Sequence, residues 1–133
     1  MKSPKHVFIV DDDIDDRDLF IEAVDQIDPS IECKSAQDGQ DALQKLNDGI
    51  ERLPDIIFLD LNMPRINGKQ CLEQLKNTNH LKHIPVAIYT TSSFQKDIDE
   101  TRQLGAEYFI TKPANFRELC RVIAQVIAPQ QVQ

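Results

Sequence analysis

The chain has 133 residues, and 22 acidic residues against 15 basic ones leave a formal net charge of −7 at pH 7. This length predicts one domain with a sizeable apolar core, and no apolar run approaches the roughly 20 residues that span a bilayer. The acidic balance argues against direct DNA binding, which needs a basic face. Three widely spaced cysteines argue against a secreted disulfide scaffold and favour a cytoplasmic protein.

Five short runs of apolar and β-branched residues are typical of strands. They are residues 7–10, 31–35, 56–59, 86–89 and 108–110. The first, third and fourth runs are almost entirely apolar, as expected of strands buried on both faces. The second run alternates between apolar and polar residues, which favours a position at the edge of a sheet.

Segments with apolar residues at helical spacing follow these strands. The first helix is expected after the acidic stretch 11–18, with an apolar stripe that extends to Ile27. The second helix has Asp38 as a candidate N-cap and apolar residues at positions 42, 43 and 46. Leu72 and Leu75 mark the third helix.

The last two helices are predicted from their ends as much as from their apolar faces. The fourth covers residues 94–104 and is expected to stop at Gly105. The fifth begins after Asn115, which has Glu118 at capping-box spacing, and its apolar stripe continues to Ile127. The polar residues 129–133 are expected to form a frayed end.

Strands that alternate with helices predict parallel pairing through right-handed crossovers, and hence a doubly wound α/β domain. We expect a five-stranded parallel sheet in the flavodoxin-like order 2-1-3-4-5, with five helices on its faces. In that order the ligand-binding crevice opens outside the carboxyl ends of strands one and three. The single domain is expected to occupy residues 1–133, with a core from about 6 to 127 and a short polar tail.

The negative charge is concentrated in residues 11–18, which contain six aspartates in the sequence DDDIDDRD. The later ones, Asp15, Asp16 and Asp18, are expected at the start of a helix, where the macrodipole stabilises acidic side chains. Asp11 and Asp12 instead follow a strand directly. Two carboxylates about 4 Å apart repel by on the order of 4 kcal/mol at an effective dielectric constant of about 20. A divalent cation is the usual partner that offsets such repulsion.

Polar side chains also follow three other strands at the points where those strands end. Asp60 follows the third strand, Thr90 the fourth, and Lys112 the fifth, where it precedes Pro113. Because parallel strands end at the same edge of a sheet, these groups are expected to meet Asp11 and Asp12 in one crevice.

These strand ends lie in motifs that resemble the receiver domain of two-component response regulators, and specifically a stand-alone regulator of the chemotaxis type. The motifs, taken in order and spacing, are VDDD at 10–13, LDLNMP at 59–64, ING at 66–68, YTTS at 89–92 and ITKP at 110–113. The resemblance spans about residues 6–127. It implies a flavodoxin-like fold and a phosphoacceptor function.

The resemblance implies a role for each residue of the crevice. Asp60 would be the phosphoacceptor, and Mg²⁺, or Mn²⁺ as a substitute, would be held by Asp11, Asp12, Asp60 and the backbone carbonyl of Asn62. Lys112, the hydroxyl of Thr90 and the peptide N–H of Thr91 would contact the phosphoryl group. Thr90 and Phe109 would form the conformational switch. Pro113 would match the family's cis-proline, although the sequence leaves the isomer of its peptide bond open.

The resemblance also implies the partners. A sensor histidine kinase or a phosphotransfer protein would supply the phosphoryl group, and an unidentified downstream protein would receive the signal. The chain would not be a classical enzyme, although it would catalyse its own phosphorylation and dephosphorylation. It is expected to be cytoplasmic, without an output domain, DNA binding or membrane contact, and to be a monomer or a weak dimer.

Two other functions use similar residues. A haloacid-dehalogenase-type phosphatase would use Asp11 as nucleophile, Asp13 as a second acid and a bound magnesium ion. Such enzymes need a larger core, and residues 59–64 would then have no role. A degenerate receiver that only binds partners is disfavoured by the complete set of crevice residues.

Other candidate sites have simpler explanations. Asp11, Asp13, Asp15 and Glu22 match part of a calcium loop, but Asp16 replaces the required glycine and no helix precedes the loop. His80 and His83 have the spacing of metal ligands, yet their polar surroundings favour a surface loop. The cysteines, Cys33, Cys71 and Cys120, are expected to be inert packing residues.

Overall fold

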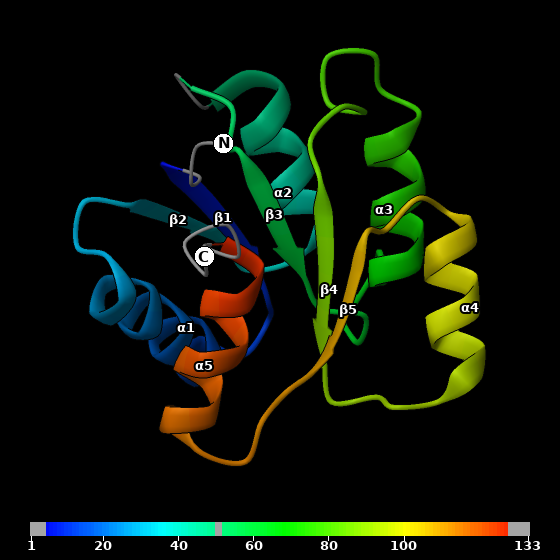
Figure 1. The fold of residues 1–133 in the computed structure, drawn as a ribbon. Coiled ribbons are helices and arrows are strands. Elements are labelled where there is room, and N and C mark those ends of the chain that lie inside the picture. The colour runs from blue at the N-terminus through cyan, green and yellow to red at the C-terminus, as the bar shows by residue number, and fades with distance from the viewer. Residues whose placement is uncertain (1–4, 50–51, 128–133) are drawn as a thin grey trace.

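A computed structural model describes residues 5–49 and 52–127 of the chain. Strands and helices alternate along these residues as the sequence pattern predicts (Figure 1). Their bounds are β1 His6–Val10, α1 Ile14–Ile27, β2 Glu32–Ala36, α2 Gly39–Gln44, the π-helix η1 Lys45–Gly49, β3 Ile56–Leu59, α3 Gly68–Lys76, β4 Val86–Thr90, α4 Gln95–Gln103, β5 Tyr108–Thr111 and α5 Phe116–Ile127.

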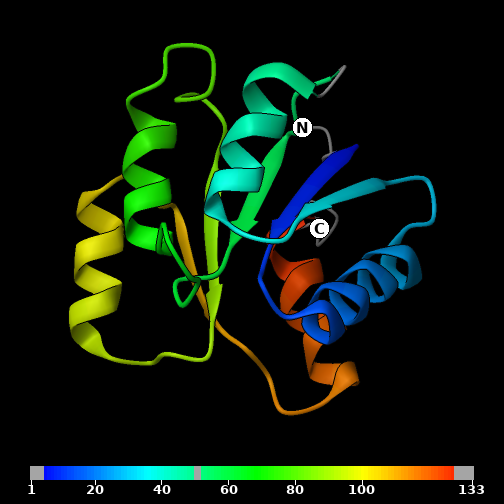
Figure 2. The ribbon, with the colours of Figure 1, turned by 180° about the vertical axis from the view of Figure 1, so that it is seen from behind.

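The five strands form one parallel sheet in the order β2-β1-β3-β4-β5, which confirms the predicted flavodoxin-like topology. β1 lies between β2 and β3, and its residue Val10 is opposite Ala36 of β2 on one side and Leu59 of β3 on the other. At the far side of the sheet, Thr90 of β4 is opposite Thr111 of β5. All strands therefore end at one edge, which Figures 1 and 2 show from opposite sides.

Helices cover both faces of this sheet and bury two separate apolar layers. α1 and α5 pack together on one face, where Phe20, Val24 and Ile123 lie fully buried. α2 and α3 cover the other face and bury Ala42 and Leu72. β1, β3 and β4 are buried almost throughout, as their continuous apolar sequences predict, since both of their faces are covered.

Side-chain caps begin the helices close to where the sequence places them. Asp38 accepts a hydrogen bond from the backbone N–H of Asp41 at 2.7 Å, which confirms it as the N-cap of α2. The capping box predicted before α5 is only half formed. Asn115 accepts from the N–H of Glu118, but the Glu118 carboxylate pairs with Arg121 one turn further along the helix.

The structure differs from the sequence pattern in a few local details. The second helix is not uniform, because its last turn, Lys45–Gly49, is π-helical. β2 is shifted by one residue, to Glu32–Ala36, and β4 and β5 extend to Thr90 and Thr111. Gly105 has a φ of 109° and ends the fourth helix as expected, since glycine tolerates this conformation. The predicted frayed end at 129–133 lies outside the described residues.

Three further features complete the fold. Cys33, Cys71 and Cys120 are all free thiols, as expected, and burial raises the pKa of the Cys71 thiol to about 12. His80 and His83 are exposed between α3 and β4, as predicted for a surface loop. Within residues 5–49 and 52–127, no helix is long and apolar enough to cross a membrane.

Candidate functional site

The strand ends bring the predicted site residues together at the carboxyl edge of the sheet. Backbone hydrogen bonds continue past the strands, since the N–H of Asp60 donates to Val10 and that of Lys112 donates to Thr90. This pairing carries the polar side chains into the molecule. Asp11 and Thr90 are completely buried, and only 4% of the surface of Asp60 is exposed.

Three carboxylates meet at this edge. Asp11, Asp12 and Asp60 each offer an oxygen atom, and these atoms lie within 4.8 Å of one another. No other group of acidic, histidine or cysteine side chains in the described ranges has a comparable arrangement. Carboxylate oxygens are the ligands that hard divalent cations prefer. The cluster, which we call the acidic cluster, therefore fits a divalent metal ion.

Lys112 is the cation next to the acidic cluster. Its Nζ atom lies 2.7 Å from Oδ2 of Asp11, 2.8 Å from Oδ2 of Asp16 and 3.8 Å from Oδ2 of Asp60. The expected proximity to Asp60 is thus present, but the two hydrogen bonds go to Asp11 and Asp16. Asp16 was expected to serve only as a helix-start charge. Its position in the first turn of α1 is visible in the sequence, whereas its contact with β5 depends on the tertiary fold.

Burial governs the electrostatics of this site. It raises the pKa of Asp60, and the nearby charge of Asp11 adds to this effect, while Lys112 opposes it. Burial likewise raises the pKa of Asp11 despite its hydrogen bond from Lys112. Burial acts to lower the pKa of Lys112, but its hydrogen bonds to Asp11 and Asp16 outweigh this effect and raise it. One lysine does not compensate the buried carboxylates, so a further cation would stabilise them.

Thr90 places a hydroxyl group beside the acidic cluster. Its Oγ1 atom is buried and has no hydrogen-bond partner among the described residues. The hydroxyl is close enough to Asp60 to act to lower the pKa of that carboxyl group. A buried hydroxyl without a partner costs free energy, so this atom fits an incoming acceptor such as a phosphoryl oxygen. Thr91, the next residue, is exposed.

The loop between β3 and α3 is held close to Asp60. A Cβ atom at Gly68 would lie 2.2 Å from the carbonyl oxygen of Asp60, so only glycine fits there. Asn62 is exposed, and its N–H lies 3.5 Å from Oδ1 of Asp60. Arg65 has a φ of 64° and pairs with the buried Asp38 at 2.8 Å. The sequence reasoning did not single out Arg65, because no local pattern shows a pair 27 residues apart.

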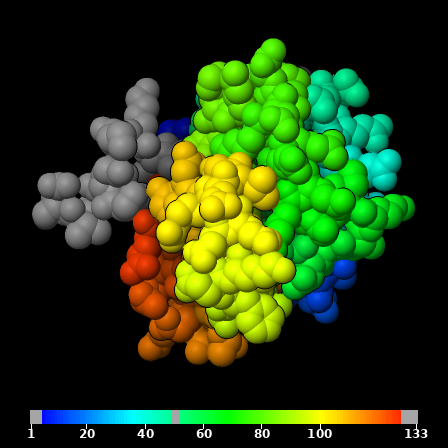
Figure 3. Space-filling model, turned by 90° about the vertical axis from the view of Figure 1, so that its right-hand side faces the viewer, coloured from blue at the N-terminus to red at the C-terminus, as the bar shows by residue number. Residues whose placement is uncertain are grey.

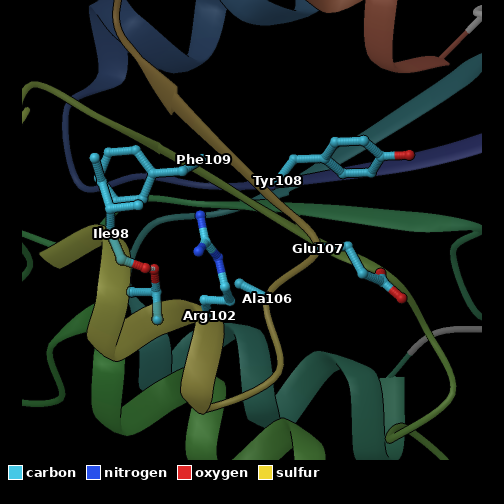
Figure 4. A pocket seen from close by; sticks show the side chains of 7 residues that line it. Ile98, Arg102, Ala106, Glu107, Tyr108 and Phe109 are labelled. Carbon is cyan, nitrogen blue, oxygen red and sulfur yellow. Dashed lines mark hydrogen bonds between the residues drawn. The ribbon is translucent and has the colours of Figure 1, made fainter. Parts of the chain in front are cut away.

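Phe109 lies on β5, on the side that faces α4. It lines a cavity of about 60 Å³ together with Ile98 and Arg102 of α4. Figure 4 shows the Phe109 ring beside Ile98, whereas Tyr108, its neighbour in the strand, points away from it. Phe109 is half-buried and packs against the α2 and α3 side of the core. The ring of Phe109 therefore borders a small cavity between β5 and α4.

The peptide bond before Pro113, whose isomer the sequence leaves open, is trans, as are all the described peptide bonds. The trans isomer is the more stable form of such bonds by roughly 0.5–1 kcal/mol. Lys112 reaches Asp11 and Asp16 with this trans bond in place.

The fold and this edge define a class of protein, the flavodoxin-like α/β domain with buried carboxylates at its topological switch point. The family can be stated as well. The family model for the response regulator receiver domain matches residues 7–124, and the chain therefore belongs to the response regulator receiver family. Receiver domains of response regulators are signalling proteins, which is the role that the motifs implied.

Known proteins of this family resemble the chain over most of its length. The response regulator Rcp1 of Synechocystis is 30% identical over 124 residues, which cover 90% of this chain and 84% of Rcp1. The polar-differentiation response regulator DivK of Brucella anthropi is 32% identical over 110 residues, or 83% of this chain and 85% of DivK. The phosphorylated cyanobacterial phytochrome response regulator RcpA superposes with a TM-score of 0.85 and 32% identity, over 95% of each chain.

The alternative functions lose support at this point. A phosphatase of the haloacid dehalogenase type would use Asp11 and Asp13, but Asp11 is fully buried against Lys112 and Asp13 caps α1. The family match gives that alternative no support. Asp13 accepts from the N–H groups of Asp15 and Asp16, a helix cap rather than a calcium loop.

Proposed function

We propose that Asp60 accepts a phosphoryl group from a phosphohistidine of a sensor histidine kinase or a phosphotransfer protein. The observation that carries this proposal is the position of Asp60, buried within the acidic cluster and flanked by Lys112 and the unpartnered hydroxyl of Thr90. An Asp60 oxygen would form a bond to phosphorus as the bond from phosphorus to the histidine nitrogen breaks. The proton needed by the leaving imidazole comes from its own protein or from water.

Mg²⁺, with Mn²⁺ as a substitute, is the metal we propose for the acidic cluster. Asp11, Asp12 and Asp60 would hold it, together with the backbone carbonyl of Asn62, and it would neutralise charge on the phosphoryl group. The oxygen donors and the raised pKa values of Asp11 and Asp60 fit such an ion. The structure of Rcp1 with bound Mn²⁺, at a TM-score of 0.83 and 28% identity over 94% of this chain and 96% of that chain, supports the proposal.

The other side chains would bind and orient the phosphoryl group. Lys112 would release part of its interaction with Asp11 and pair with a phosphoryl oxygen, since its Nζ atom is already 3.8 Å from Asp60. Thr90 would donate its free hydroxyl, and Thr91 its peptide N–H. These donors would stabilise the charge that develops during transfer.

Phosphorylation would then change the surface that the protein presents to a partner. Thr90 would move toward Asp60, and Phe109 would turn in the space between β5 and α4. The partner is proposed to be a downstream protein rather than DNA or a membrane, because the chain has a net charge of −7. We further propose that residues 1–133 act in the cytoplasm as a monomer or weak dimer.

The test is to incubate the protein with acetyl phosphate and Mg²⁺ and to identify the modified residue by mass spectrometry. We expect one labile phosphoryl group on Asp60 and none on the Asp60→Asn variant. Label on Asp11, or equal labelling of the Asp60→Asn variant, would overturn the proposal and support the phosphatase alternative. A chelator should abolish the labelling.

A further inference from the structure

The chain segment that follows β4 makes hydrogen bonds with two other elements, α4 and β5. Ser92 is the centre of these contacts. Its hydroxyl donates a hydrogen bond to Oδ2 of Asp97 in α4 and accepts one from the N–H of Phe94 at 3.3 Å. Its carbonyl oxygen accepts a hydrogen bond from the hydroxyl of Thr111, at the end of β5, at 3.0 Å. The hydroxyl and the carbonyl of Ser92 are thus both engaged.

Asp97 connects this segment to the first turn of α3. Its other oxygen, Oδ1, lies 2.6 Å from Nζ of Lys69, and Lys69 also pairs with Glu100 of α4. α3 and α4 lie side by side on one face of the molecule, which Figure 3 shows with α4 in yellow and α3 in green. Hydrogen bonds from Ser92 and Lys69 lower the pKa of Asp97, so this side chain is a charged acceptor at neutral pH.

Lys69 lies at the start of α3, which packs directly against the chain at Asp60. It follows Gly68, where a Cβ atom would lie 2.2 Å from the carbonyl oxygen of Asp60 and whose N–H donates to the carbonyl of Leu61 at 2.9 Å. The chain of contacts from Asp60 through Gly68, Lys69 and Asp97 to Ser92 therefore links the two loops that flank the site. We call the side-chain part of it, Lys69, Asp97 and Ser92, the Ser92 restraint.

Thr90 indicates what this restraint does. Its buried hydroxyl has no partner among the described residues although Asp60, a strong acceptor, is nearby. An unsatisfied buried donor favours any movement that brings it to an acceptor. In the structure the Thr90 hydroxyl has not made such a movement. The contacts that would oppose it are those of Ser92, two residues further along the chain.

We propose that Ser92 and Asp97 are positioning residues that hold Thr90 and Thr91 away from Asp60 until a phosphoryl group is bound. This inference rests on the proposed function of Asp60. Breaking the restraint should lower the cost of moving the segment inward, and the protein should then bind a phosphoryl group or its analogue more tightly. The net value of one such hydrogen bond corresponds to a change of about three- to tenfold in affinity.

The experiment measures the affinity of the full chain for beryllofluoride, a phosphoryl analogue, at saturating Mg²⁺ by fluorine NMR. Ser92→Ala and Asp97→Asn should each bind it about three- to tenfold more tightly than the parent protein. Ser92→Thr retains the hydroxyl and should restore the parent affinity. Glu100→Gln is the matched control, because Glu100 pairs with Lys69 whereas the Ser92 hydroxyl bonds to Asp97, and the affinity of this variant for beryllofluoride should be unchanged.

The outcomes distinguish a failure of the Ser92 restraint from a failure of the proposed phosphoacceptor function of Asp60. Unchanged affinity in Ser92→Ala and Asp97→Asn, or weaker binding, would overturn the restraint, and so would an equal effect of Glu100→Gln. Mg²⁺ affinity without beryllofluoride should be the same in all variants, since none of these residues belongs to the acidic cluster. If the parent protein binds no beryllofluoride and is not phosphorylated at Asp60, the proposed function itself fails.

Discussion

Two lysines of this protein each sit between acidic side chains, and the two clusters behave differently. The Lys112 cluster contains Asp11, Asp16 and Asp60, and the Lys112 side chain is 11% exposed. The Lys69 cluster contains Asp97 and Glu100, and its lysine is 28% exposed. The pKa values of Asp11 and Asp60 are raised, whereas that of Asp97 is lowered.

The opposite pKa shifts in the two clusters follow from the burial of the carboxylates and from the number of hydrogen-bond donors that each carboxylate has. At Asp97 the hydrogen bonds from Lys69 and Ser92 exceed the small cost of removing water, so the carboxylate is well stabilised. At Asp11 and Asp60 the cost of burial exceeds what one lysine contributes. In the Lys69 cluster the carboxylates have enough donors, so the cluster holds α3 and α4 together. In the Lys112 cluster the carboxylates lack enough positive charge, so that cluster can bind a further cation.

The largest expected effect on stability comes from removing Lys112, and removing Lys69 is the matched comparison. Without divalent metal, Lys112→Met should lower the free energy of unfolding by about 3 kcal/mol, because it leaves buried carboxylates without their cation. The matched variant Lys69→Met should lower it by at most about 1 kcal/mol. Urea denaturation in a chelator measures both. Equal losses would contradict the distinction between the clusters.

Mg²⁺ should stabilise the protein through the acidic cluster. At about 100 times its dissociation constant, the ion should raise the free energy of unfolding by about 2.7 kcal/mol. Asp60→Asn should weaken this stabilisation, and Asp97→Asn should leave it intact, since only Asp60 belongs to the acidic cluster. Thermal unfolding with and without Mg²⁺ provides the measurement. A Mg²⁺ response that persists undiminished in Asp60→Asn would place the ion elsewhere.

The two clusters should have opposite pH dependences in the metal-free protein. Asp11 and Asp60 have folded-state pKa values above 3.8, so the folded state retains protons more strongly. Their contribution to stability is present below about pH 3.8 and is lost as the pH rises through the raised values. Asp97 has a lowered pKa, so its contribution is present above about pH 3.8 and is lost as the pH falls through that lowered value.

Urea midpoints between about pH 3 and 7, measured in a chelator, separate these contributions. Asp60→Asn should reduce the loss of stability on raising the pH, and Asp97→Asn should reduce the loss on lowering it. If the urea midpoint changed with pH in the same way in both variants, the two carboxylates would have similar environments.

The smallest expected effect is that of Glu100→Gln. Glu100 is well exposed and shares its lysine with Asp97, so its removal should cost only about 0.5 kcal/mol in the free energy of unfolding. Denaturation at low and high salt measures this value, and salt should reduce it further. A loss as large as that of Lys112→Met would show that the Lys69 cluster is not a surface network.

Much of this structure is predictable from local sequence. Continuous apolar runs identify β1, β3 and β4, and the positions just after the strands identify Asp60 and Lys112 as neighbours. These predictions succeed because parallel strands share one edge, so a residue's place in its strand determines its place in the fold. The half-formed capping box at Asn115 and the π-helical turn at Lys45–Gly49 depend on side-chain competition, which a spacing rule does not contain.

The sequence by itself determined the order of the strands, the edge that carries the chemistry and the aspartates that gather there, because alternation and strand ends are local properties. Only the tertiary structure decided which charged and polar side chains pair with one another. It assigns Lys112 to Asp11 and Asp16 and connects Ser92 to α3 through Asp97. It also leaves the Thr90 hydroxyl without a partner among the described residues. The physical reason is that burial and contacts between distant residues set the cost of each charge, and both exist only in the packed fold.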